Sequence, residues 1–259
     1  LEVGGASKAL LLAKGYSRMV IKQVSEAKGI VVEARFKATK TTFDELLTEE
    51  VNIPLTEAQQ AVYGSIQAAM NSHEHKTFLL HGVTGSGKTQ LYLRATAKCI
   101  SQDKTAIILV PEIILTDQIV RRFVETFGDE VVVFHSKLTV QQRNNNWERL
   151  RRKDSHIIIG ARSAVFAPAE DIGLIVVDEE HDPSYKQEDM VRYHARNVAL
   201  WRAEAHGCPV ILGSATPSVT SYYKAKQGEY HLLELPNRIF EQPMPKVTIV
   251  DMNCLLYTS

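Results

Sequence analysis

The chain has 259 residues, of which 44% are hydrophobic and 23% charged, as in folded globular proteins and unlike disordered, collagen-like or coiled-coil chains. Thirty basic residues balance thirty acidic ones, so the net charge of zero identifies no class of partner. No apolar run approaches the roughly 20 residues of a membrane span, and no secretion signal opens the chain. Three cysteines without a CxxC pair argue against a disulfide framework or a structural zinc site. We therefore expect a cytoplasmic protein without a membrane partner.

The distribution of charge divides the chain near residue 52. Residues 1–40 carry eight basic and three acidic side chains, whereas residues 41–57 carry five acidic side chains and no basic one. Two short helical patterns followed by an apolar run predict a small winged-helix-like module over residues 1–52, for which DNA contact and protein docking both stay open. Thr56 is placed to cap a helix that runs to about residue 71. The main domain is predicted over residues 53–252, and residues 253–259 are expected to be a tail from an expression vector.

From residue 77 onward, short apolar runs alternate with segments of helical periodicity. Apolar strands separated by crossover helices predict an α/β fold whose parallel sheet is covered on both faces. The predicted strands are 78–80, 106–110, 131–134, 157–159, 174–177 and 210–212. The predicted helices are 88–101, 113–127, 139–152 and 194–206. Trp147 and Trp201 fall in helical segments and are predicted to pack in the core, as is the small apolar side chain of Cys99.

A glycine-rich segment with the sequence GVTGSGKT follows the first of these strands and opens a helix. Its glycines let the backbone fold around phosphates, so that consecutive N–H groups and the positive end of the helix face the anion. Lys88 is predicted to reach the β and γ phosphates, and Thr89 to bind Mg²⁺. The alternative is a turn that binds nothing, but chance would produce this pattern in only about one chain in a hundred of this length. The predicted nucleotide-binding residues in this segment are Gly82, Gly85, Ser86, Gly87, Lys88 and Thr89.

The predicted strand at 174–177 runs into the acidic sequence DEEH at 178–181. A carboxylate at the C-terminal end of a parallel strand points into the crevice where such sheets bind ligands. Asp178 is therefore predicted to hold Mg²⁺ through water, and Glu179 to activate the attacking water. By itself, such a run is more often a solvated loop. The phosphate loop favours the catalytic interpretation, with Lys88, Asp178 and Glu179 as the catalytic residues.

These motifs resemble those of superfamily 2 helicases of the DExH type, and the segment at 111–118 (PEIILTDQ) resembles motif Ia of that superfamily. The sequences VPEI at 110–113, DEEHD at 178–182 and the segment 184–196 resemble the PriA family of bacterial replication-restart helicases. The resemblance implies a RecA-like lobe, ATP and Mg²⁺ as cofactors, and 3′ to 5′ unwinding by the intact protein. It implies single-stranded and forked DNA, primosome proteins and the single-stranded-DNA-binding protein as partners. It also implies that Gln59 reads the adenine edge and that Ser214 and Thr216 couple nucleotide state to DNA. We expect the family's zinc sites and second lobe to lie outside these residues, and this chain alone to turn over ATP slowly.

A segment rich in basic and aromatic residues, 182–196, follows the predicted catalytic carboxylates. Its rings can stack on bases and its cations can bind phosphates. The alternative is a loop whose tyrosines pack on the core. A comparable loop senses single-stranded DNA in the family that the chain resembles, and the segment at 160–164 resembles a strand-contacting motif. The predicted DNA-binding residues are Arg162, Ser163, Tyr185, Lys186, Arg192, Tyr193 and Arg196.

Two other functions stay open. One is a nucleotide-gated module that docks DNA or a partner with negligible turnover, and the other is a different DExH DNA translocase. ATPase assays with and without single-stranded DNA distinguish the docking module from the helicase lobe, and a preference for forked DNA distinguishes the replication-restart function from other translocases.

Overall fold

The computed structural model describes residues 51, 53–112, 118–136, 138–189 and 191–239. The described residues fall within one compact unit. The winged-helix-like module predicted over 1–52, apart from Val51, and the predicted tail at 253–259 lie outside them. Among the described helices, none has both the length and the apolar character of a membrane span.

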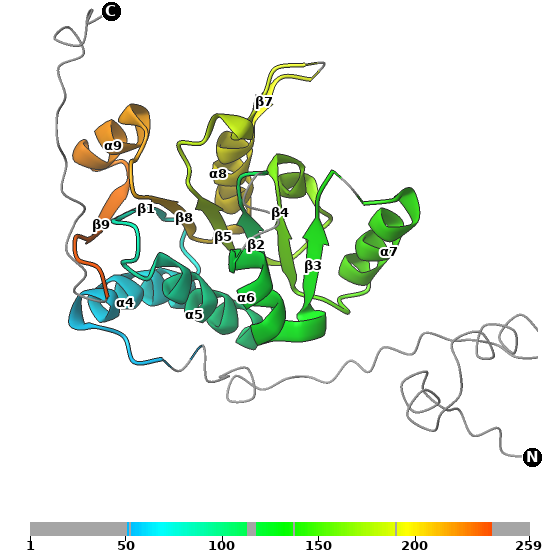
Figure 1. Ribbon diagram of the computed structural model, residues 1–259, viewed down its shortest axis with the longest axis horizontal. Coiled ribbons are helices and arrows are strands. Elements are labelled where there is room, and N and C mark those ends of the chain that lie inside the picture. Colours follow the sequence, from blue (N-terminus) through cyan, green and yellow to red (C-terminus); the bar gives the residue numbers. More distant parts are fainter. Residues whose placement is uncertain (1–50, 52, 113–117, 137, 190, 240–259) are drawn as a thin grey trace, which may run out of the picture. The chain divides into compact units, whose positions relative to one another are not determined.

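A parallel sheet of seven strands organises the described residues, with the order β3-β4-β2-β5-β8-β1-β9 (Figure 1). The strands are β1 (Thr77–Gly82), β2 (Thr105–Leu109), β3 (Val131–Phe134), β4 (Ile157–Gly160), β5 (Ile172–Asp178), β8 (Val210–Ser214) and β9 (His231–Leu235). The helices are α4 (Glu57–Ser72), α5 (Lys88–Ser101), α6 (Gln118–Phe127), α7 (Val140–Arg151), α8 (Ala195–His206) and α9 (Val219–Lys226). An antiparallel hairpin of β6 (Lys186–Gln187) and β7 (Tyr193–His194) projects from this body (Figure 1).

Both faces of the sheet are buried, which explains why its central strands are apolar throughout. Successive residues of a strand point to opposite faces. Leu80 and Ile108 join a cluster with side chains of α4, α5 and α6, whereas Leu79 and Ile107 join a second cluster with side chains of α7 and α8. The prediction of a parallel sheet covered on both sides is confirmed.

Helix α4 begins where the sequence predicts. The side chain of Thr56 accepts a hydrogen bond from the backbone N–H of Gln59, and the Gln59 side chain accepts one from the N–H of Thr56, which forms a capping box. The helix ends at His73, whose left-handed backbone (φ 53°) closes the last turn. Local hydrogen bonding therefore determines both ends of this helix.

Three sequence predictions need correction or extension. Trp147 and Trp201 do not pack in the core, because their exposed fractions are 43% and 68%. Strand β9 was not predicted; among the described residues it pairs only with β1, at the edge of the sheet, and exposed His231 and Glu234 interrupt its apolar residues. The predicted helix at 113–127 is described only from Gln118 onward. Cys99 is fully buried, as predicted.

Candidate functional site

The sheet brings the predicted motifs together at its C-terminal edge. Strands β5, β8 and β1 are neighbours, and the register pairs Asp178 with Gly213 and His81 with Ser214. The phosphate loop, the acidic sequence at 178–181 and the segment that contains Ser214 and Thr216 therefore lie side by side, although they are far apart in the chain. This is the edge at which parallel α/β sheets bind ligands.

The phosphate loop joins β1 to α5 and depends on glycine. Gly85 and Gly87 have φ values of 81° and 84°, which residues with a Cβ rarely adopt. Gly87 is the N-cap of α5 and makes no side-chain capping bond, so the first N–H groups of the helix face the loop. A Cβ at Gly87 would also clash with the amide of Gln59 and with Ile239.

The polar groups of this loop fit a phosphate. The hydroxyl of Ser86 is buried and has no hydrogen-bond partner among the described residues. Such a group is uncommon in a folded protein and suits a ligand oxygen. The ammonium of Lys88 donates to the carbonyl of Gly82 at 2.8 Å and has two further N–H groups. The loop thus combines a helix N-terminus, a lysine and an unsatisfied hydroxyl.

Gln59 contacts the phosphate loop directly. Its Nε2 donates to the carbonyl of Ser86 at 2.9 Å, and its Oε1 accepts from the N–H of Thr56 at 3.0 Å. The side chain is nearly fully buried. Gln59 therefore ties the start of α4 to the loop, and its contact with adenine stays a prediction.

Asp178 is the last residue of β5 and is almost buried, with an exposed fraction of 9%. Its Oδ1 accepts a hydrogen bond from the hydroxyl of Tyr92 at 2.9 Å. Burial and the nearby charge of Glu179 raise the pKa of Asp178 to about 6, while Tyr92 and the ammonium of Lys88 act in the opposite direction. At neutral pH the carboxylate is mainly ionised and interacts electrostatically with the ammonium of Lys88.

The residues after Asp178 contact Ser214, the last residue of β8, and Thr216, which follows that strand. Glu179 has a left-handed backbone (φ 45°), an unusual conformation for a residue with a Cβ. His181 Nδ1 lies 2.8 Å from the hydroxyl of Ser214, and its Nε2 lies 3.5 Å from that of Thr216. The two predicted coupling residues thus touch the histidine that follows the carboxylates, although coupling itself stays a prediction.

Sequence reasoning missed the role of Glu180. Its side chain is fully buried and accepts hydrogen bonds from the Ser218 N–H at 2.6 Å and from the Ser221 hydroxyl at 2.8 Å. Arg196 Nη1 lies 2.6 Å from Glu180 Oε2 and also contacts both serine hydroxyls. Burial would raise the pKa of Glu180, but the hydrogen bonds from Ser218, Arg196 and Ser221 lower it overall. No local sequence signal indicates this buried cluster.

Two predicted DNA contacts need correction on structural grounds. Arg196 has a side-chain exposed fraction of 14% and is bound to Glu180, so its charge is not presented to a DNA backbone. Tyr185 is fully buried, and its hydroxyl donates to the carbonyl of Asp178 at 2.6 Å. Its ring is not available for stacking on a base. The alternative interpretation, in which a tyrosine of this segment packs on the core, holds for Tyr185.

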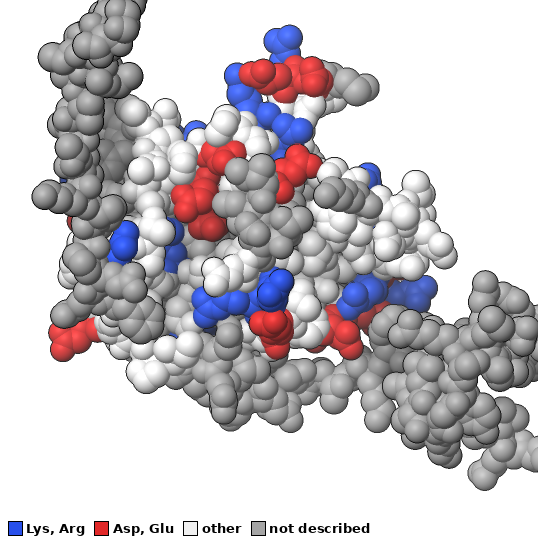
Figure 2. Space-filling model, viewed as in Figure 1, with Lys and Arg blue, Asp and Glu red and all other residues white. Residues whose placement is uncertain are grey.

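The other predicted DNA-binding residues lie on or beside the β6–β7 hairpin. Lys186 and Arg192 are exposed on it, and the half-buried ring of Tyr193 packs edge-to-face on Phe166 with 4.9 Å between ring centres. Arg162 donates to the carbonyls of Ser184 and Lys186, so it supports the base of the hairpin. Figure 2 shows both basic and acidic side chains on this projection. Lys186 forms an ion pair with Glu188 at 2.7 Å. Ser163 is exposed. DNA binding by these residues stays a prediction.

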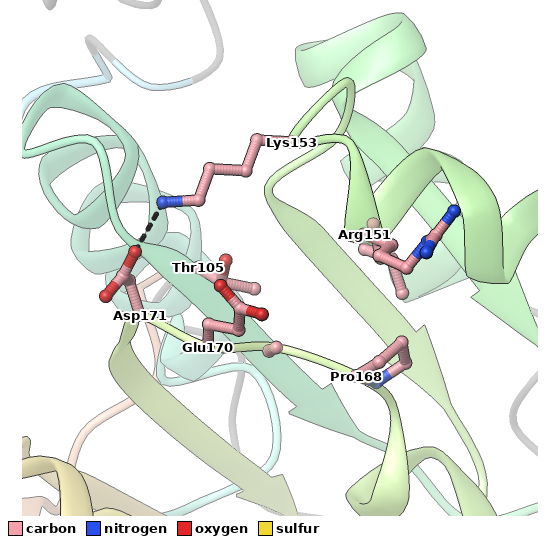
Figure 3. A pocket seen from close by; sticks show the side chains of 8 residues that line it. Thr105, Arg151, Lys153, Pro168, Glu170 and Asp171 are labelled. Atoms are coloured by element: carbon pink, nitrogen blue, oxygen red, sulfur yellow. Dashed lines mark hydrogen bonds and ion pairs between the residues drawn. The ribbon is translucent and has the colours of Figure 1, made fainter.

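A small cavity lies at the other end of the sheet (Figure 3). It is bordered by Thr105 at the start of β2 and by Asp171 just before β5, and Lys153 forms an ion pair with Asp171 across it. Its volume of about 10 Å³ holds at most one water molecule. This cavity is therefore not a ligand site and is separate from the C-terminal edge.

A parallel sheet with a phosphate loop and an acidic strand end at one edge defines a RecA-like nucleoside-triphosphate-binding lobe. The DEAD/DEAH box helicase family model matches residues 56–224, and the chain belongs to this family. Membership implies the use of ATP and Mg²⁺, for which the loop and Asp178 supply suitable groups.

Similar proteins agree with the predicted family. The chain is 48% identical over 226 residues to the replication restart protein PriA of Bacillus subtilis, in an alignment that covers 87% of this chain and 28% of the relative. It is 44% identical over 196 residues to PriA of Chlamydia pneumoniae, covering 75% of this chain and 26% of that protein. The resemblance to the PriA family is confirmed, and the chain spans little more than a quarter of the length of these relatives.

Solved structures confirm the fold. The structure of RecG bound to a three-way DNA junction superposes with a TM-score of 0.56 at 22% identity, covering 80% of this chain and 26% of that chain. The crystal structure of the DUF1998 helicase MrfA bound to DNA and AMPPNP gives a TM-score of 0.52 at 17% identity, covering 85% of this chain and 34% of that chain. At these identities the likeness concerns the fold alone.

Proposed function

We propose that this chain is the ATP-binding motor lobe of an ATP-dependent DNA helicase that acts in replication restart. The observation that carries the proposal is the convergence of the phosphate loop and Asp178 at one sheet edge, because β1 and β5 lie on either side of β8. The identity to replication restart proteins over 87% of the chain supports the same function.

Each residue of the site has a part in this proposal. The N–H groups at the start of α5, the hydroxyl of Ser86 and the ammonium of Lys88 bind the phosphates. Thr89 and Asp178 hold Mg²⁺, and Glu179 accepts a proton from the attacking water. When bound, ATP and Mg²⁺ supply the transferable phosphoryl group and the neutralising charge. Gln59 keeps the loop in place and contacts the base.

DNA is the proposed polymer substrate. Lys186 and Arg192 on the β6–β7 hairpin bind the phosphates of single-stranded or forked DNA, with Ser163 and Tyr193 beside them. The contact of His181 with Ser214 and Thr216 relays nucleotide state to this surface. By resemblance, the intact protein moves 3′ to 5′, and primosome proteins and the single-stranded-DNA-binding protein are its partners.

Calorimetry on a lysine variant tests the nucleotide site. Lys88→Ala removes a charge-assisted phosphate contact worth about 1.5 to 3 kcal/mol, so ATP affinity should fall roughly ten- to a hundredfold. Lys98→Ala, in the last turn of the same helix, is the matched control and should bind ATP as the wild type does. Equal ATP affinity in the wild type and Lys88→Ala would overturn the proposal. Tight binding with no turnover, even with DNA and the rest of the protein present, would favour the docking module instead.

A further inference from the structure

Tyr92 donates a side-chain hydrogen bond to Asp178, and Tyr92 belongs to none of the family motifs. Tyr92 is fully buried in α5, and its hydroxyl lies 2.9 Å from Asp178 Oδ1. Residues three and four positions apart share one face of a helix. Tyr92 is three residues after Thr89 and four after Lys88, so the face of α5 that carries the phosphate-binding residues also reaches the strand end at Asp178.

Gly213 makes room for this contact. It lies in β8 between β1 and β5, and its backbone partner in β5 is Asp178. A Cβ at this position would clash with the Tyr92 hydroxyl and would lie 3.3 Å from Asp178 Oδ1. The hydroxyl therefore occupies the space that any other residue at 213 would fill. Three elements, α5, β5 and β8, converge on one hydrogen bond.

We propose that Tyr92 is a positioning residue that orients the Asp178 carboxylate for Mg²⁺. This inference rests on the proposed function of the site. The hydroxyl takes one acceptor position on Oδ1 and fixes the plane of the carboxylate, whose other lone pairs stay available to the water molecules of the metal ion. Partners that orient a metal-binding carboxylate in this way are needed for full metal affinity.

The Tyr92 hydroxyl is suited to this role because it stays a donor. The hydroxyl donates to Asp178 Oδ1 at 2.9 Å, and both side chains are buried, so the hydrogen bond is shielded from water. A phenylalanine would fill the same apolar volume without the hydrogen bond. The volume at this position and the orientation of Asp178 can therefore be separated experimentally.

The test measures nucleotide binding by calorimetry with a non-hydrolysable ATP analogue, with and without Mg²⁺, on the full chain. Tyr92→Phe should keep the metal-free affinity of the wild type and lose about 10- to 100-fold of the gain that Mg²⁺ provides. Gly213→Ala, which keeps the tyrosine but displaces its hydroxyl from Asp178, should lose part of the same gain. The matched control is Tyr63→Phe, because Tyr63 is also buried but lies in α4.

The outcomes separate this inference from the proposed function. If the wild type binds no nucleotide, or if Lys88→Ala binds as well as the wild type, the proposed function fails. If the wild type binds normally and folded Tyr92→Phe keeps the whole Mg²⁺-dependent gain, only the role of Tyr92 is refuted. A loss of affinity that is equal with and without Mg²⁺, together with a lower unfolding temperature, would also refute it, since it marks a purely structural hydroxyl. Should Tyr92→Phe fail to fold, Gly213→Ala decides the question.

Discussion

Replacing Arg196 by methionine should destabilise the fold rather than weaken DNA binding directly. Arg196 Nη1 lies 2.6 Å from the carboxylate of Glu180, which is fully buried. Methionine keeps much of the apolar volume of arginine but removes the charge and its hydrogen bonds. The variant therefore leaves an anion in the protein interior without its cation.

The size of the effect follows from the remaining partners of Glu180. Removing one partner of a buried ion pair costs about 3 to 5 kcal/mol when nothing compensates. Here the N–H of Ser218 and the hydroxyls of Ser218 and Ser221 still donate to the carboxylate. We therefore expect a loss nearer to one charge-assisted hydrogen bond, about 2 to 3 kcal/mol in the free energy of unfolding at pH 7.

The loss should depend on pH in a defined direction. The pKa of Glu180 lies below its ordinary value of 4.5 because donated hydrogen bonds outweigh burial. Its ionised form therefore stabilises the fold above the pKa of the unfolded chain, and this contribution is lost as the pH falls through the folded pKa. Without Arg196 the folded pKa rises. The stability difference between the wild type and Arg196→Met should then shrink as the pH falls below about 4.5.

Urea denaturation at pH 7 and at lower pH measures this difference. The control is Arg192→Met, because Arg192 is exposed in the same chain segment and its loss should leave the unfolding free energy within about 0.5 kcal/mol of the wild type. Arg192→Met should instead reduce the affinity for single-stranded DNA and flatten its salt dependence. If Arg196→Met unfolds like the wild type and weakens DNA binding as much as Arg192→Met does, the structural role assigned to Arg196 is wrong.

Four further substitutions test other parts of the structure. Thr56→Ala removes the capping box of α4 and should cost about 1 kcal/mol in chemical denaturation; a neutral effect would contradict the cap. Gly87→Ala forces a Cβ into a backbone with φ of 84° and should lower the free energy of unfolding by at least about 1 to 2 kcal/mol. Gly64→Ala lies in the middle of α4 with open space around it and should raise the free energy of unfolding by up to about 1 kcal/mol. Thermal unfolding should show these opposite signs. Asp178→Asn should stabilise the fold at pH 8 by up to about 3 kcal/mol, because the pKa of Asp178 is raised to about 6 and ionisation above that pH costs stability. This gain should diminish as the pH falls from 6 toward the ordinary value of 3.8, and denaturation curves that do not change with pH would contradict the raised pKa.

Much of the fold was determined by local sequence. All six predicted strands occur, because a strand buried on both faces must be apolar at every position and so forms a recognisable run. The phosphate loop was equally evident, since the left-handed backbone at Gly85 and Gly87 requires glycine. The N-terminus of α4 was predictable because its cap involves residues only three apart. Strand β9 was missed because exposed His231 and Glu234 interrupt it, so it forms no continuous apolar run.

Only the tertiary structure decided which side chains of residues 182–196 face the interior. Arg192 and Arg196 are the same residue type in one segment, and nothing local distinguishes them. Arg196 opens α8 beside the buried Glu180, whereas Arg192 is exposed near the turn of the hairpin. The two tyrosines of the segment also differ: the hydroxyl of Tyr185 donates a hydrogen bond to the carbonyl of Asp178, whereas the ring of Tyr193 packs on Phe166.

The contact between Tyr92 and Asp178 could not be predicted from the sequence either, because it depends on which elements pack together. It joins residues 86 positions apart and needs the space beside it that β8 leaves open at Gly213, which has no Cβ. Secondary structure follows from patterns within a few residues, so it can be predicted from one sequence. The partner of a buried polar side chain depends on which strands become neighbours, and that is settled only when the sheet is assembled.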